Sequence, residues 1–259
     1  MANVTSTVDA TLPHDDGHGD DHAHAHLPFM QHHFDTPAQQ FDASKLGMWI
    51  FIATEILMFG GLFVAYGIFR NLDDEVFKEA HLYLNKQMGA LNTIVLLFSS
   101  LTAALSVRSA QLGKRNATSA YLVITILCAC AFLVVKYFEY HHKFEDGLLP
   151  GHCFGHPWFG DACLTAGSPG SHPLAIHGEH GLPALTPRAN MFFGLYFIMT
   201  GLHGVHVVIG MSILIWVLIK NIKGHFSPAY FTHVDLGALY WHLVDLVWIY
   251  LFPLLYLVG

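Results

Sequence analysis

Five long runs of apolar residues, separated by polar breaks, dominate the pattern of this 259-residue chain. They cover approximately residues 46–69, 89–111, 119–140, 190–219 and 237–257. A helix needs about 20 apolar residues to cross a bilayer, so each run has the length of a span. The runs are continuous rather than alternating, which favours helices over strands as the way to satisfy the backbone in lipid. The pattern predicts an all-α membrane bundle with five transmembrane helices.

Composition supports a membrane protein, because the chain is 53% hydrophobic and only 12% charged. Soluble domains average about 25% charged residues. The net charge of −7 argues against a nucleic-acid partner. Residues 1–45 are polar and rich in His and Asp, without the apolar core of a signal peptide, and we expect a disordered tail there. Residues 46–259 are then one five-helix membrane domain with a long polar loop at 141–189.

The basic residues indicate an orientation. The 12 Lys and Arg side chains divide equally between the two sides of a five-span topology, so their total does not decide which side faces the cytoplasm. Arg108, Lys114 and Arg115 form the densest basic cluster in a short loop, which favours the cytoplasm for that side. The N-terminus is then cytoplasmic, and the C-terminus and loop 141–189 lie outside.

The four cysteines form two pairs. Cys128 and Cys130 lie in an apolar run, where thiols usually pack as small apolar groups. Cys153 and Cys163 lie in the loop, and an oxidising compartment would favour a disulfide between them. A zinc-type site that includes the loop histidines is the alternative.

Glu55 lies near the middle of the first apolar run. A carboxyl group in hydrocarbon favours its neutral form unless a cation or a water chain reaches it. Ionisable groups at this depth are costly and are often functional, so Glu55 is a candidate proton-linked carboxyl. The alternative is a neutral acid that hydrogen-bonds to a neighbouring helix.

Two further polar pairs have helical spacing inside apolar runs. His203 and His206 lie one turn apart, as do His242 and Asp245. Imidazoles at i and i+3 share a helix face and could hold a metal, and a carboxylate can orient an imidazole. Both sets are incomplete as metal sites. We favour interhelical hydrogen bonding for His203 and His206 and an intrahelical polar clasp for His242 and Asp245, and we assign no metal or catalytic residue.

Lys136 and Glu139 repeat this spacing near the end of the third run, where snorkelling or a simple ion pair explains them. The polar set therefore comprises His203, His206, His242, Asp245 and Glu139. Fourteen of the twenty histidines lie in the tail and the 141–189 loop, and such tracts can bind transition metals weakly. A metal-transport protein is thus a competing hypothesis. A stand-alone enzyme has the least support, since no nucleophile–base pair or complete metal site is evident.

Three segments together resemble subunit III of the haem–copper oxidases, in a five-helix short form. They are Ala53–Phe63, Thr200–Val207 and Tyr240–Trp248, and Phe138–Tyr140 is also similar. The resemblance covers approximately residues 46–140 and 190–259, in the family's order. Two helices that precede Glu55 in long family members are absent, loop 141–189 is longer than usual, and the His-rich tail lies outside the family pattern.

The resemblance implies a non-catalytic subunit of a proton-pumping terminal oxidase in a bacterial-type cytoplasmic membrane. Haem and copper are then held by partner subunits I and II, and this chain packs on subunit I, binds structural phospholipid and supports proton uptake. Glu55 matches the family's carbodiimide-reactive glutamate, and Lys220, Lys223 and His225 match its lipid-headgroup segment. Cytochrome c is the expected electron donor. A quinol oxidase or a nitric-oxide-reductase-associated homologue are alternatives, and other respiratory complexes are further candidate partners.

Overall fold

The computed structural model describes residues 36–146, 148–150, 188–224, 226 and 230–258. In this part of the chain, five helices are long and apolar enough to cross a membrane, which confirms the predicted all-α bundle. They are α1 (Pro37–Leu72), α3 (Lys86–Gln111), α4 (Arg115–Glu145), α6 (Ala189–Ile222) and α7 (Thr232–Phe252). A π-helical turn, η3 (Pro253–Leu257), extends α7. Two short elements not expected from the sequence, α2 (Asp74–Ala80) and η1 (His81–Tyr83), connect α1 to α3.

Helix α1 begins at Pro37 rather than Leu46, so the expected tail is wrong for residues 37–45. The hydroxyl of Thr36 accepts a hydrogen bond from the Gln39 amide at 3.2 Å, which caps the helix. Proline in the first turn suits a helix start, because its missing N–H would have no helical partner there. An ion pair of 3.2 Å between Lys45 and Asp235 then ties this polar extension to α7.

Helices α3 and α4 pack against each other, and their buried positions include many small and polar residues. On α3 the buried positions repeat every seven residues, at Gly89, Leu96, Ala103 and Ala110 and at Asn92, Ser99 and Ser106. On α4 they repeat at Thr118, Thr125, Phe132 and Glu139 and at Leu122, Ala129, Lys136 and Lys143. A seven-residue repeat keeps one seam facing its partner, and small residues let the helices approach closely. The hydroxyls of Thr102 and Thr125 hydrogen-bond across the seam at 2.8 Å.

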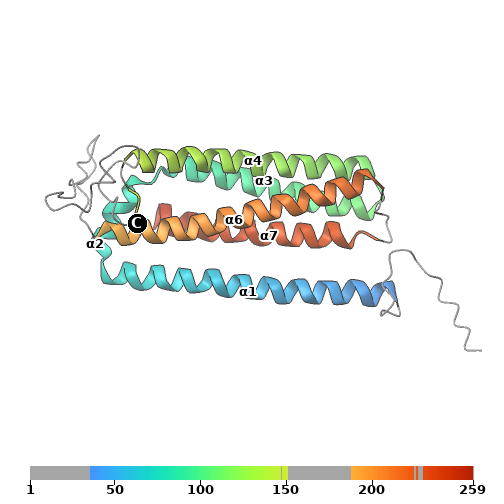
Figure 1. Ribbon diagram of the computed structural model, residues 1–259, viewed down its shortest axis with the longest axis horizontal. Coiled ribbons are helices and arrows are strands. Elements are labelled where there is room, and N and C mark those ends of the chain that lie inside the picture. Colours follow the sequence, from blue (N-terminus) through green and yellow to red (C-terminus); the bar gives the residue numbers. More distant parts are fainter. Residues whose placement is uncertain (1–35, 147, 151–187, 225, 227–229, 259) are drawn as a thin grey trace, which may run out of the picture.

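Helix α1 lies at the edge of the bundle, on the side of α6 and α7 away from α4 (Figure 1). Only 11% of its apolar window is buried, compared with 56% for the last span. It is held at a few points along its length, among them the hydroxyl of Tyr66, which donates to the Leu254 carbonyl at 3.0 Å. Most of its surface therefore faces lipid or another chain.

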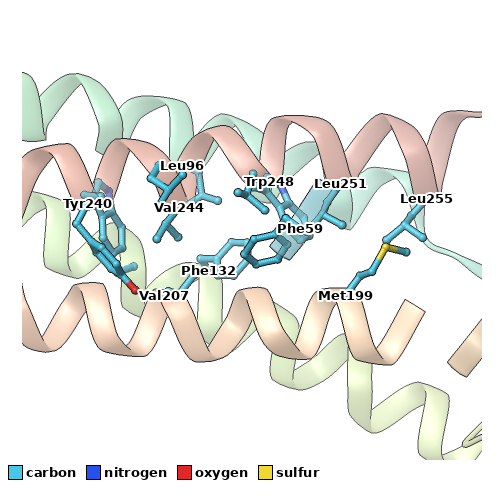
Figure 2. Packing of buried hydrophobic residues seen from close by; sticks show 14 of the residues in the cluster. Phe59, Leu96, Phe132, Met199, Val207, Tyr240, Val244, Trp248, Leu251 and Leu255 are labelled. Carbon is cyan, nitrogen blue, oxygen red and sulfur yellow. The ribbon is translucent and has the colours of Figure 1, made fainter. Parts of the chain in front are cut away.

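Aromatic side chains fill the middle of the bundle, where Phe132 and Trp248 meet edge to face with ring centroids 4.9 Å apart (Figure 2). The indole N–H groups of Trp248 and Trp241 donate to Thr93 and Ser99 of α3 at 3.1 and 3.0 Å. These bonds satisfy buried donors that lipid could not. They fix α7 against α3.

One end of the bundle is closed by a reciprocal contact between α4 and α6. The guanidinium of Arg115 donates to the carbonyls of Asn221 and Ile222 at 3.3 and 2.7 Å, which caps the end of α6. The side-chain amide of Asn221 donates in turn to the backbone carbonyl of Arg115 at 3.0 Å. Gly224, with φ +79°, lies against the same guanidinium, so this turn needs both its left-handed backbone and its small size.

Candidate functional site

The first candidate site is a contact between α1 and α6 near the middle of both spans. The Nε2 atom of His206 lies 2.9 Å from Oε2 of Glu55, and both side chains are largely buried, at 12% and 15% exposed. The other ring nitrogen of His206, Nδ1, lies 2.8 Å from the Leu202 carbonyl one turn earlier. Phe59 packs edge-on against the imidazole at 5.3 Å. The pair links the most exposed helix to the bundle.

The geometry fixes where protons lie in this pair. A carbonyl only accepts, so Nδ1 of His206 must carry a hydrogen and donate it to Leu202. The Nε2···Oε2 contact then needs one further proton, which either a carboxylic acid or an imidazolium supplies. Both arrangements hold one proton between Glu55 and His206. The pair therefore shares one proton, which lies on either the Glu55 carboxyl group or the His206 ring.

A pocket of about 580 Å³ opens beside this pair, between α1, α6 and α7. Glu55, His206 and His233 contribute its polar lining, and the rest includes Phe51, Ile209, Ile213, Trp216 and Tyr240. The ammonium group of Lys220 lies over the Trp216 ring, 4.0 Å from the ring centroid. The pocket thus extends from a proton-holding pair toward a basic helix end. A long apolar chain with an anionic head has matching chemistry.

The second candidate site is an ion cluster buried between α4, α6 and η3. Nζ of Lys136 lies 2.9 Å from Oε2 of Glu139 and 2.9 Å from the Tyr256 hydroxyl. The hydroxyls of Tyr196 and Tyr256 both donate to Oε1 of Glu139, the former at 2.9 Å. Glu139 is 3% and Lys136 is 8% exposed. Snorkelling of Lys136 toward water is therefore wrong, because its ammonium is enclosed by these partners and by the Trp248 ring at 4.7 Å.

The remaining mid-membrane groups do not form one network. His203 is 1% exposed, packs between Phe132 and Trp248, and has no hydrogen-bond partner among the described residues. Interhelical hydrogen bonding is thus wrong for His203, although it is right for His206. His242 bonds to Ser100 of α3 through Nδ1 at 2.8 Å rather than to Asp245. Neither carboxylate oxygen of Asp245 has a hydrogen-bond partner in the described ranges.

Comparison with known proteins finds similar sequences among oxidase subunits. A family model described as cytochrome c oxidase subunit III matches residues 182–259. Similar relatives include cytochrome c oxidase subunit 3 of Corynebacterium diphtheriae, 28% identical over 83% of this chain and 87% of the relative. Cytochrome c oxidase subunit 3 of Thermostichus vulcanus is 28% identical over 92% of this chain and 91% of the relative. Quinol oxidase subunit 3 of Bacillus spizizenii is 27% identical over 83% of this chain and 86% of the relative. The chain is therefore similar to cytochrome c oxidase subunit III over most of its length.

The structure describes part of the segment expected to contact lipid headgroups. Lys220 is half-buried over Trp216, and Lys223 is exposed at the end of α6. Arg108, Lys114 and Arg115 lie at the same end of the bundle, where α3 ends and α4 begins. His225, Cys153, Cys163 and the His-rich tail lie outside the described residues. Cys128 and Cys130 are free thiols, and Sγ of Cys130 contacts the Met211 sulfur at 3.7 Å.

The histidines near the middle of the membrane contact different helices. His206 contacts α1, His203 contacts α4 and α7, and His242 contacts α3. Over the ranges that the structure describes, no three His, Cys, Asp or Glu side chains form a group that could hold a metal ion. A metal carrier needs ligands that converge from several helices, and the described histidines do not have this arrangement.

Sequence reasoning missed three partners of the predicted residues. Tyr196 and Tyr256 complete the Glu139 cluster, and Ser100 completes the contact of His242. All three lie in apolar runs, where a hydroxyl gives no signal of its own. Their partners are 57, 117 and 142 residues away along the chain, so only the packing of the helices reveals them.

Proposed function

We propose that this chain is the non-catalytic subunit III of a proton-pumping haem–copper terminal oxidase. In this role it packs on subunit I, binds structural phospholipid and supports proton uptake, while subunits I and II hold haem and copper. The observation that carries the proposal is the Glu55–His206 pair, a one-proton store at the middle of the membrane beside a lipid-sized pocket. Relatives over most of the chain are named as oxidase subunits, which supports the partners.

The pocket beside Glu55 has the chemistry of a phospholipid site. Its walls are mainly apolar and aromatic, and Lys220 lies at its Trp216 end, where an anionic headgroup would meet the ammonium. Lys223 and the Arg115 cluster add positive charge at the same end. The acyl chain would then reach toward Glu55 and His206 and keep bulk water away from the pair.

Charge also supports the proposed orientation. The end of the bundle with Arg108, Lys114 and Arg115 faces the cytoplasm, where basic residues and anionic lipids concentrate. The N-terminus then lies inside and the C-terminus outside. The donor to the complex is cytochrome c or quinol, since relatives of both kinds have nearly the same identity to this chain. The donor site belongs to the partner subunits.

Affinity purification through this chain in a mild detergent tests the proposal. Haem and copper that co-purify with two larger subunits would support it, and the haem spectrum would narrow the donor. A colourless, monodisperse protein with stoichiometric zinc or copper would overturn it in favour of metal transport.

We expect Glu55→Gln to leave the complex assembled. The glutamine amide can donate to Nε2 of His206, so the link between α1 and α6 remains while the exchangeable proton is lost. Haem content and initial oxygen consumption should stay within about twofold of the wild type, less than ~0.5 kcal/mol of activation free energy. A hydrophobic carbodiimide should modify the wild-type protein at Glu55, as peptide mass spectrometry would show.

Glu55→Leu is the matched control, because it removes the hydrogen bond as well as the proton. We expect it to weaken the attachment of α1 by about 1–3 kcal/mol, since Nε2 of His206 is left without a partner. Complete loss of the haem-containing complex in Glu55→Gln would contradict a role peripheral to the redox chemistry.

Lys220→Gln should lower the amount of anionic phospholipid that the purified protein retains. One basic residue near the membrane surface contributes about 1 kcal/mol to such binding, which corresponds to about fivefold in affinity. Native mass spectrometry with phosphatidylglycerol would measure the change. Lys78→Gln is the control, because Lys78 is exposed and paired with Asp74 at the opposite end. Equal retention in both variants would exclude Lys220 as a headgroup ligand.

A further inference from the structure

Asp245 is a buried carboxyl group near the middle of the last span. It is 3% exposed, and no cationic side chain in the described part of the chain pairs with either of its oxygens. A carboxylate enclosed by apolar groups is costly unless a cation compensates it, whereas the neutral acid avoids most of this cost. Asp245 is therefore held as the neutral acid, and the hydrogen of that acid needs an acceptor.

The hydroxyl group of Ser100 on α3 is shared between this carboxyl group and His242. Its oxygen lies 2.8 Å from Nδ1 of His242. The same hydroxyl interacts with the Asp245 carboxyl group, in a contact too distorted to satisfy either carboxyl oxygen fully. Neighbouring hydroxyls on α3 behave differently, since Ser99 and Ser106 donate to carbonyls of their own helix. Ser100 thus joins two ionisable side chains that lie one turn apart on α7.

A hydroxyl group in this position can relay a proton, because it donates one hydrogen bond while it accepts another. In the first state, the acid hydrogen of Asp245 points to Ser100, the Ser100 hydrogen points to Nδ1 of His242, and the ring hydrogen lies on Nε2. Both shared hydrogens then move along these contacts, and the Nε2 hydrogen leaves to water. The second state has a carboxylate, an intact hydroxyl and a ring hydrogen on Nδ1, so both contacts persist with their directions reversed. One proton has moved from Asp245 to water, and the same steps in reverse restore it.

His242 connects the buried carboxyl group to the surface of the bundle. Its side chain is half-buried, whereas Asp245 is enclosed. Helix α7 starts at the end of the bundle where Arg115 caps α6, so His242 lies one turn closer to that end than Asp245 does. The relay therefore leads out of the core and toward the side that the proposed function assigns to the cytoplasm.

The other ionisable groups around Asp245 leave this route as the connected one. Helix α3 has no ionisable side chain between Thr93 and Val107, and Glu55 of α1 is bonded to His206. The groups that approach from other helices are the Cys128 thiol of α4 and, across the ring of Trp248, His203 of α6 and Lys136 of α4. The ammonium group of Lys136 is paired with a carboxylate of its own helix. Over the described ranges, Ser100 is the hydrogen-bonding neighbour through which Asp245 reaches the surface.

We propose that Asp245 is a proton-binding carboxyl group besides Glu55, and that it exchanges its proton with water at the α3–α7 surface through Ser100 and His242. Lipid tails supply no water at this depth, so the exchange takes place where another subunit of the complex replaces lipid over His242. In this step the inference rests on the proposed function, and it adds to the role in proton uptake. Glu55 shares its proton directly with an imidazole, whereas Asp245 reaches its imidazole through a hydroxyl group.

Infrared spectroscopy of the purified complex tests whether Asp245 carries a proton, because the carbonyl stretching band of a carboxylic acid disappears when the group ionises. We expect such a band in the wild type and its loss in Asp245→Asn. Glu55→Gln is the control for the other membrane carboxyl group, and it should keep the Asp245 band. A wild-type spectrum without any acid band that Asp245→Asn removes would overturn the proposal.

Transfer into heavy water tests the route, since deuteration shifts the same band. Ser100→Ala and His242→Phe should retain the acid band and slow its exchange by about a hundredfold, the lower end of what a positioned proton-transfer group contributes. Ser106→Ala is the matched control on α3, because its hydroxyl donates to the Ala103 carbonyl, and it should exchange at the wild-type rate.

Equal exchange rates in the wild type, Ser100→Ala and His242→Phe would overturn the relay and leave a purely structural polar clasp. A wild-type band that never exchanges would do the same. A wild-type chain that purifies without haem would instead refute the proposed function. The Asp245 band can still be recorded on that chain, so the two failures are distinguishable.

Discussion

Glu139→Leu should be the most damaging single substitution in the described part of the chain. It would leave the Lys136 ammonium buried without its carboxylate and remove the acceptor of the Tyr196 and Tyr256 hydroxyls. Lys143, which is 3% exposed nearby, adds a second positive charge. Breaking a buried ion pair on one side costs about 3–5 kcal/mol, because the remaining charge is uncompensated. Thermal unfolding in detergent and the yield of folded protein would measure the loss.

The double variant Lys136→Met/Glu139→Leu distinguishes an uncompensated charge from lost packing. Replacement of both members of a buried ion pair by apolar residues is often close to neutral, so we expect recovery of more than half of the lost stability. Glu145→Leu on the same helix is the surface control, since Glu145 is 51% exposed and its ion pairs among the described residues are with His141 and His142. It should change stability by less than about 0.5 kcal/mol. A Glu139→Leu protein as stable as Glu145→Leu would show that the cluster contributes little.

The number of spans and the depth of the polar groups could be predicted from the sequence. Hydropathy measures, for each residue, the free energy of placing its side chain in the membrane. Glu55 and His206 were found for this reason. Their contact could not be predicted, since 151 residues separate them and nothing local specifies that α1 packs on α6. The early start of α1 was missed for a different reason. Thr36 and Pro37 are a capping signal, but hydropathy alone ignores it.

The α3–α4 seam was also present in the sequence, in a form that apolar patterns do not reveal. On α4 the buried seven-residue repeat includes Thr125, which bonds to α3, and continues through Lys136 and Glu139, whose partners lie on α6 and η3. A search for apolar repeats in water would reject such positions. In a membrane the outer face is apolar, and the seam is marked by small and polar residues instead. Lys136 and Glu139 belong to this repeat. Their burial follows from the seven-residue period rather than from their distance to the helix end.

Gly210→Leu should separate α6 from α7. A Cβ at Gly210 would lie 3.0 Å from the Trp241 ring and 3.1 Å from the Tyr240 ring. Trp241 is fully buried and its N–H is bonded to Ser99, so it cannot retreat without loss of that contact. Overpacking of this kind costs about 1–3 kcal/mol, and a leucine at so close a contact should fall at the upper end of this range.

Gly204→Leu on the same helix is the matched control, because a Cβ there would meet nothing within 4 Å. Leucine forms helix better than glycine by up to about 1 kcal/mol, so we expect this variant to be neutral or slightly stabilised. Thermal unfolding of both variants in the same detergent measures the difference. Equal destabilisation would mean that glycine is required along α6 for helix packing in general. A stable Gly210→Leu protein would instead show that the α6–α7 interface can repack, and that the close approach of Trp241 is not what holds α7 in place.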